Sequence, residues 1–250
     1  AYVADGESGL CIIDASDLVN PTEVSFHDTP GRATDVVVSG SYAYVADGDG
    51  GLRIIDVSDP AHPTEVGSND TPGWAMGVAL SGSYALVADG YGSGLRIIDV
   101  SDPAQPAEIG SYQTPKWAWS VATAGSYAYV ADGFGGGLRI IDISDPAQPT
   151  ETGSYVSPLR YAEDVAVAGG YAFVADGYTS GLLIIDVSDP VHPTETSSYS
   201  TPGWAWDVEV SGSYAYGAYG FSGLRIIDVS DPARPIEIGS YDTPDVAWDV

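Results

Sequence analysis

The sequence predicts an all-β protein, a six-bladed β-propeller with four antiparallel strands per blade. Three observations support this prediction: a unit of roughly 42 residues occurs six times, each unit holds four strand-like segments, and the two chain ends complement each other. The aspartate of an Ile-Ile-Asp motif marks the period, at intervals of 42, 43, 43, 44 and 42 residues. Its positions are Asp14, Asp56, Asp99, Asp142, Asp186 and Asp228. Because the composition does not change along the chain, we expect residues 1–250 to form a single domain.

Each unit divides into four short segments that are rich in β-branched and aromatic residues. The first follows a Thr-Pro or Ser-Pro pair, as at 33–38, and a turn such as Ser-Gly-Ser leads to the second, as at 127–133. A glycine-rich loop precedes the third, as at 95–100, and a Ser-Asp-Pro turn precedes the fourth, as at 106–110. Gly, Pro, Ser and Asp separate these segments, so no stretch is long enough for a helix.

The two ends of the chain supply complementary parts of one unit. Residues 1–6 correspond to a second strand and residues 246–250 to a first strand, so each strand type is present six times. We therefore expect residues 246–250 to complete the first blade and to close the ring by pairing with the N-terminal strand, which removes large exposed sheet edges. An open solenoid is the alternative. Because residue 1 lies inside a repeat, we also expect a processed or trimmed chain.

Composition and charge exclude several classes of protein. Hydrophobic residues make up 44% of the chain, which is typical of a folded protein. No apolar run approaches the roughly 18–20 residues of a membrane-spanning helix, so we expect no membrane insertion. The single cysteine, Cys11, allows no internal disulfide. With 35 acidic and 8 basic residues the net charge is −27, which repels phosphate groups and argues against a nucleic-acid partner.

No pattern of catalytic residues stands out. The three histidines lie in or beside turns, and the sequence has no Ser-His-Asp order, phosphate-binding glycine loop or histidine metal motif. Two carboxylates could still meet across the ring, as they do in glycosidases, so a glycoside-active enzyme is the remaining enzymatic alternative. We expect a protein that is not an enzyme.

Most acidic residues belong to the repeat itself. The aspartates of Ile-Ile-Asp and Ser-Asp-Pro are expected to accept backbone N–H bonds in turns. An arginine that recurs in the third segment is expected to pair with a glutamate that recurs in the fourth. Four aspartates of the first segments could coordinate Ca²⁺ near the centre, with solvated or turn-capping carboxylates as the alternative. They are Asp35, Asp164, Asp207 and Asp249.

The copies differ most at the residues on either side of the alanine that follows Thr-Pro, and all six tryptophans lie there. The loop after Ala-Asp-Gly adds further aromatic residues. In a propeller this loop and the start of the innermost strand share one face, so we expect a ligand-binding surface of aromatic rings and aspartates. Its predicted members are Trp74, Trp117, Trp204, Tyr91, Phe134, Tyr178, Phe221, Asp89, Asp132 and Asp176. The alternative is that the tryptophans pack between blades, above all those after the alanine.

Three recurring segments resemble the LVIVD-repeat family, a bacterial and archaeal group that forms propellers. They are Tyr-Val-Ala-Asp-Gly at 129–133, Gly-Leu-Arg-Ile-Ile-Asp-Val-Ser-Asp-Pro at 94–103 and Pro-Thr-Glu-Val at 63–66. The likeness covers essentially the whole chain. Members of this family are commonly parts of exported or surface-attached proteins, so the resemblance implies an interaction module outside the cytoplasm, at the cell surface or in the extracellular space.

Two function classes follow from these patterns. In the first, the aromatic and aspartate surface binds glycans, because aromatic faces stack on sugar C–H groups while carboxylates accept hydroxyl hydrogen bonds. In the second, the chain is a structural or protein-interaction domain of a larger surface protein, and the same face holds a peptide or protein. We expect a monomer in either case.

Overall fold

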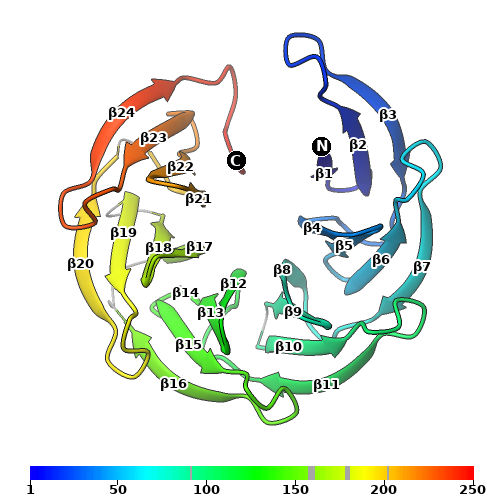
Figure 1. Cartoon of the computed structure of the whole chain (residues 1–250), viewed down its shortest axis with the longest axis horizontal. Helices are drawn as coiled ribbons and strands as arrows, with labels where there is room; N and C mark the ends of the chain where they lie inside the picture. Colours follow the sequence, from blue (N-terminus) through cyan, green and yellow to red (C-terminus); the bar gives the residue numbers. More distant parts are fainter. Residues whose placement is uncertain (91, 157–160, 178–180, 202) are drawn as a thin grey trace. The chain divides into compact units, whose positions relative to one another are not determined.

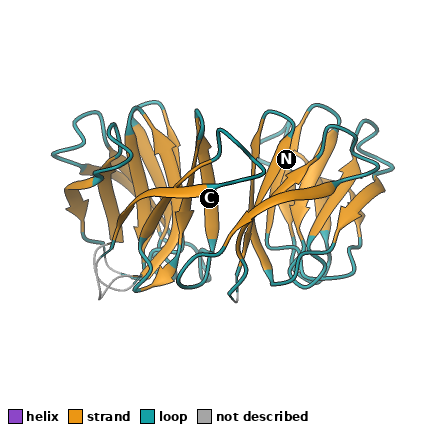
Figure 2. Cartoon of the chain, turned by 90° about the horizontal axis from the view of Figure 1, so that it is seen from below, coloured by secondary structure: helices purple, strands orange, loops and turns teal. Residues whose placement is uncertain are grey.

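The computed structural model describes residues 1–90, 92–156, 161–177, 181–201 and 203–250. In these ranges the regular structure consists of β-strands joined by loops and turns (Figure 2). The same ranges contain no helix that is long and apolar enough to cross a membrane. Contacts group the chain into two compact units, one made of residues 1–113 and 146–148 and the other of residues 114–145 and 149–250.

The described residues of the first unit form three antiparallel sheets, one for each of the first three repeats (Figure 1). The strand orders are β1-β2-β3, β4-β5-β6-β7 and β11-β10-β9-β8. The strands are β1 (Tyr2–Ala4), β2 (Leu10–Asp14), β3 (Thr22–His27), β4 (Asp35–Ser39), β5 (Tyr42–Ala46), β6 (Leu52–Asp56), β7 (Thr64–Asn69), β8 (Ala75–Ser81), β9 (Tyr84–Asp89), β10 (Gly94–Asp99) and β11 (Ala107–Tyr112).

The described residues of the second unit form the sheets of the other three repeats, ordered β12-β13-β15-β16, β14-β17-β18-β19-β20 and β21-β22-β23-β24. The first two contain β12 (Ser120–Ala124), β13 (Tyr127–Ala131), β14 (Gly133–Phe134), β15 (Leu138–Asp142), β16 (Thr150–Tyr155), β17 (Tyr161–Ala168), β18 (Tyr171–Asp176), β19 (Gly181–Asp186) and β20 (Thr194–Tyr199). The last contains β21 (Asp207–Ser211), β22 (Tyr214–Ala218), β23 (Leu224–Asp228) and β24 (Ile236–Tyr241).

Each repeat thus forms one antiparallel blade, and the predicted fold, an all-β propeller with six blades and four strands in a complete blade, is confirmed. The sheet β1-β2-β3 holds the second, third and fourth strands of its repeat, as the sequence of the first repeat predicts. Pairing between the two ends of the chain, closure of the ring and the single domain over residues 1–250 stay predictions.

Three innermost strands, β4, β12 and β21, begin two residues after the alanine and so later than the sequence predicts, whereas β8 begins at Ala75 and β17 at Tyr161. Ala33 exchanges two backbone hydrogen bonds with Gly6, of 2.9 and 3.0 Å, and β4 begins only at Asp35. The same bridge joins Ala75 to Gly48 and Ala247 to Gly220. This alanine is buried in five repeats and half-buried at Ala247, so at the buried positions a larger side chain would have to displace its neighbours.

The apolar core lies between neighbouring sheets within each unit. Alternate residues of a strand point to opposite faces, so a buried strand contributes to two core layers. Leu10 and Ile12 of β2 pack with Val45 of β5, whereas Tyr44, the neighbour of Val45, packs with Val78 of β8. The second unit has the same layers between its sheets. Because both faces of the inner strands are covered, the Tyr-Ala-Tyr-Val-Ala segments read as continuous apolar runs.

The recurring charged residues take the structural roles that the repeat predicts. Asp56 accepts the backbone N–H of Ser58 at 2.8 Å, and its hydrogen bonds with Ser58 hold the pKa of this carboxyl below its usual range. The equivalent aspartates of the other repeats do the same with their own serines. Arg96 lies 3.3 Å from Glu108 on the neighbouring strand, and three further repeats repeat this ion pair. Turn geometry and strand pairing therefore account for much of the acidity.

Candidate ligand-binding site

The aspartate of Ala-Asp-Gly is the centre of a buried polar cluster in four repeats, as Asp47, Asp89, Asp132 and Asp176. Asp89 is fully buried, and its carboxylate accepts the Thr71 hydroxyl at 2.7 Å and the Gly73 N–H at 2.9 Å. Arg96 places its Nε 3.4 Å from the same carboxylate. Because Thr71 and Gly73 flank the proline of Thr-Pro, Asp89 holds the turn that presents Trp74. Asp47 repeats this arrangement one blade earlier.

The predicted role of these aspartates in contacting a ligand therefore has to be corrected. Asp89, Asp132 and Asp176 are 0 to 1% exposed, and their oxygens bond to protein groups instead of facing solvent. Asp132 accepts the Lys116 N–H and contacts Arg139 at 3.3 Å, while Asp176 accepts the Tyr161 N–H at 2.9 Å. A short side chain at the end of a strand is drawn inward where backbone donors need an acceptor. These carboxylates position the aromatic residues.

The tryptophans that directly precede the alanine after Thr-Pro are exposed to different degrees. Trp74 is 38% exposed and Trp117 is 47% exposed, while Trp204 is half-buried. Trp74 lies directly against Gly48 of the preceding blade, where an added Cβ would come within 2.9 Å of its Cε2 atom. The indole of Trp74 therefore packs on a glycine, while part of its surface remains accessible to solvent.

The loop after Ala-Asp-Gly carries the most exposed aromatic rings of the predicted set. Phe134 is 53% exposed and Phe221 is 85% exposed. Apolar side chains at this exposure gain little from packing within the chain, and so they are available for a ligand. Tyr91 and Tyr178, the other two predicted loop residues, lie outside the described residues.

Five aromatic residues of the second unit form a continuous series of ring contacts, which we call the aromatic row. The ring centroids are 4.5, 5.2, 5.3 and 4.6 Å apart in sequence order. The members are Phe134, Tyr161, Trp204, Trp206 and Trp248. Three of the four contacts join successive repeats, while Trp204 and Trp206 lie in the same repeat, and Trp248 at the end of the row is 60% exposed. Trp117 and Trp119 form a separate pair at 6.1 Å.

The sequence-based list of site residues did not contain Tyr161, Trp206 or Trp248. All three lie directly before or after the alanine, at the two positions where the repeats differ most. A comparison of the repeats could therefore have identified them. Trp206 and Trp119 are half-buried, which agrees with packing at the second position, but Trp248 is not covered in this way. The row therefore combines packing between blades with an accessible surface.

Three of the four aspartates considered as calcium ligands accept a backbone N–H from the next inner segment of the chain. Asp35 accepts the N–H of Val78 at 2.7 Å, and Asp164 accepts that of Val208 at 2.9 Å, each across to the next blade. Asp207 accepts the N–H of Val250 at 2.9 Å, while Asp249 is exposed. In the described part of the chain no group of three or more His, Cys, Asp or Glu residues is arranged to hold a metal ion. The calcium hypothesis thus gains no support from this geometry.

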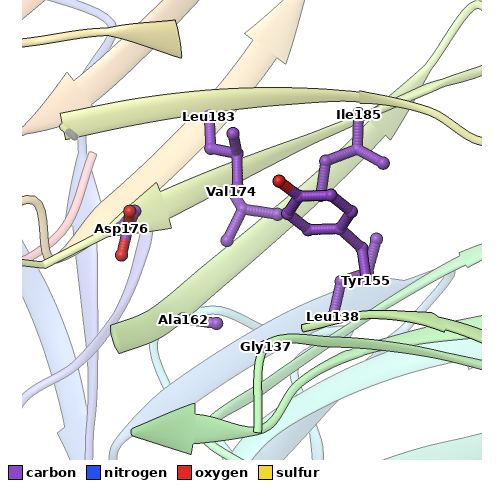
Figure 3. A pocket seen from close by; sticks show the side chains of 8 residues that line it. All are labelled: Gly137, Leu138, Tyr155, Ala162, Val174, Asp176, Leu183 and Ile185. Carbon is purple, nitrogen blue, oxygen red and sulfur yellow. The ribbon is translucent and has the colours of Figure 1, made fainter. Parts of the chain in front are cut away.

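A small cavity in the second unit lies between β15 and the sheet of β17, β18 and β19 (Figure 3). Its volume is about 10 Å³, and its walls are mostly apolar. The lining residues are Gly137, Leu138, Tyr155, Ala162, Val174, Asp176, Leu183 and Ile185. A space of this size holds one water molecule at most, so it is a packing gap and not a ligand pocket.

These features define a class of protein: a β-propeller built from near-identical blades, with aromatic side chains gathered where the inner strands begin. The LVIVD repeat profile matches residues 1–29, 30–71, 72–114, 116–157, 159–201 and 202–243. The chain therefore belongs to the LVIVD-repeat family, as its recurring segments suggested. A search of curated protein sequences finds no match.

Solved structures show the same fold at low sequence identity. A proposed 6-phosphogluconolactonase from Bacteroides uniformis ATCC 8492 is 14% identical with a TM-score of 0.81, over 94% of this chain and 79% of that one. A functionally unknown protein from Desulfotomaculum acetoxidans DSM 771 is 14% identical with a TM-score of 0.75, over 96% and 83%. The computationally designed Ika8 protein is 9% identical with a TM-score of 0.71, over 98% and 71%. At such identities the likeness shows the fold alone.

Proposed function

We propose that this chain is a non-enzymatic, ligand-binding propeller that recognises glycans through its exposed aromatic side chains. The observation that carries the proposal is the aromatic row, with Phe134 53% and Trp248 60% exposed at its two ends. Monomeric proteins rarely expose contiguous apolar surface unless it binds something. Flat aromatic faces suit the C–H patches of sugar rings, and the blade repetition supplies several such faces for one extended ligand.

The chemistry of the sequence supports binding over catalysis. No nucleophile–base pattern occurs in the chain, and the fully buried aspartates Asp47, Asp89 and Asp132 are bonded to threonine hydroxyls, backbone N–H groups or arginines. We also propose that the protein acts outside the cytoplasm, in agreement with the family resemblance, and that it binds no nucleic acid, because its charge is −27.

Glycan binding can be tested by screening the full chain on an array of oligosaccharides and measuring the affinity of the best ligand by calorimetry. Replacing Trp248 or Phe134 with alanine is expected to weaken binding up to about tenfold, which is the worth of one aromatic contact. Phe26→Ala is the control, because Phe26 is 63% exposed on β3 in the other unit. A folded protein that binds no oligosaccharide would overturn the proposal.

A second candidate function is a protein-interaction scaffold, and the outer strand β24 favours it. Ile236, Ile238 and Tyr241 are 62, 56 and 65% exposed on this strand. Exposed apolar residues on an edge strand are typical of surfaces that another chain covers. Peptide binding that Ile238→Ser abolishes and Trp248→Ala leaves unchanged would favour the scaffold over the glycan-binding module.

A further inference from the structure

An acidic side chain, that of Glu163, lies beside the aromatic row. The residue directly after the alanine is a tryptophan in three repeats, but in the repeat at 159–201 it is Glu163. Its carboxylate accepts the indole N–H of Trp204 at 3.2 Å. Trp204 in turn contacts Tyr161 and Trp206 at centroid distances of 5.2 and 5.3 Å. A carboxylate is therefore fixed in the middle of the aromatic row.

Among the described residues, Glu163 lies near a further negative charge and forms no ion pair with a positive group. Burial above all, and to a smaller extent the nearby charge of Asp176, raise the pKa of Glu163 to about 7 against the opposing hydrogen bond from Trp204. Within the described ranges no Lys, Arg or His side chain forms an ion pair with Glu163. An arriving cation would compensate this carboxylate, whereas a neutral ligand would leave it uncompensated.

We propose that the glycan bound by the aromatic row carries a free, positively charged amino group that pairs with Glu163. This inference rests on the proposed function and names the class of sugar, an oligosaccharide of unacetylated amino sugars. The ammonium group suits both partners, because it forms a charge-assisted hydrogen bond with the carboxylate and is attracted to the faces of Tyr161 and Trp204. The net charge of −27 attracts the same kind of ligand from solution.

The test compares two ligands that share one sugar backbone and differ in charge. Calorimetry on the full chain near pH 7, where a carboxyl with a pKa of about 7 is half ionised, measures the affinity for a β-1,4-linked glucosamine tetrasaccharide and for its fully N-acetylated counterpart. We expect the amino form to bind about tenfold more tightly, as one charge-assisted hydrogen bond provides. Glu163→Gln keeps an acceptor for the Trp204 N–H but carries no negative charge, so it is expected to abolish the preference for the amino form.

The matched control is Glu7→Gln, which makes the same chemical change at an exposed loop residue of the other unit. It alters the net charge equally, so it should leave the preference intact. Loss of the preference in Glu7→Gln as well would assign it to overall charge and overturn the Glu163 site. Equal affinities for the two tetrasaccharides in the native chain, or tighter binding of the acetylated one, would overturn the inference and leave glycan binding standing. Failure of the folded chain to bind any oligosaccharide would overturn the proposed function itself.

Discussion

The carboxyl groups of Asp164 and Asp207 are hydrogen-bonded to each other, across the inner strands β17 and β21 of neighbouring blades. Each also accepts a backbone N–H, from Val208 and Val250 respectively. Burial raises the pKa of both carboxyls well above the ordinary range, and for Asp207 the charges of Asp164 and Asp249 add to this effect. Two buried carboxyls in contact share a proton, because both cannot ionise without a large cost.

This pair predicts that the protein loses stability as the pH rises from about 4, near the ordinary pKa of an aspartate, to about 10, the folded-state pKa of Asp207. The folded-state pKa of Asp207 lies above the unfolded value, so its stabilising effect is complete below the unfolded pKa and is lost as the pH approaches the folded one. Glu163 acts in the same direction, between its ordinary value and about 7. The melting temperature, followed by circular dichroism at several pH values, measures the decline.

A matched pair of variants separates this effect from general charge repulsion. Asp207→Asn is expected to flatten the pH dependence, since an amide can donate to Asp164 without needing a proton. Asp49→Asn removes the same charge from an exposed loop and should keep the slope of the native protein. If Asp207→Asn retained the native slope, the shared proton would not be the cause.

Gly48 is expected to be intolerant of any side chain because Trp74 covers it. Its φ is +54°, and a Cβ added there would lie 2.9 Å from Trp74 Cε2. Gly40 has a similar φ of +60° with nothing within 4 Å. Gly40→Ala should therefore lower the free energy of unfolding by about 1–2 kcal/mol, the cost of placing an alanine in a left-handed backbone conformation. Gly48→Ala should lower it further, because the added methyl group also clashes with Trp74. Urea denaturation gives both free energies of unfolding.

The tryptophan emission spectrum provides a second measurement for this comparison. Only Gly48→Ala should shift the emission, because only there must an indole move. Equal losses of stability in the two variants would mean that Trp74 repacks freely, and the indole would then be a mobile surface residue.

The repeat made the blade architecture predictable, because strand chemistry and turn chemistry recur at a constant period. Asp56 and Arg53 could be assigned turn and ion-pair roles from their own sequence neighbours. The burial of Asp89 could not, because its partners Thr71, in the loop before β8, and Arg96, in β10, meet it only in the folded blade. The sequence repeat shows which positions are equivalent, but it does not show which side chains come into contact in the folded protein.

The aromatic row was partly predictable for the same reason. That Trp204 and Trp206 lie on one strand face follows from the two-residue spacing. The contact of Trp206 with Trp248 at 4.6 Å joins residues of successive repeats, so it depends on how blades pack and not on local sequence. The sequence places Glu163 where three other repeats carry tryptophan, but the structure is needed to show its bond to Trp204.

The Asp89 cluster makes a final prediction, about what holds the loop face in place. Asp89→Ala would leave Arg96 without its buried counter-charge and the Thr71 and Gly73 donors without an acceptor. Removing one partner of a buried ion pair costs about 3–5 kcal/mol, whereas Thr71→Val, which removes a single hydroxyl donor, should cost about 1–2 kcal/mol. Because both changes break the same hydrogen bond, the double variant should lose less than the sum of the two. Urea denaturation of the three variants measures this coupling. Strict additivity would show that the hydroxyl and the carboxylate act independently, and the turn that presents Trp74 would then be held by the Gly73 N–H and Arg96 alone.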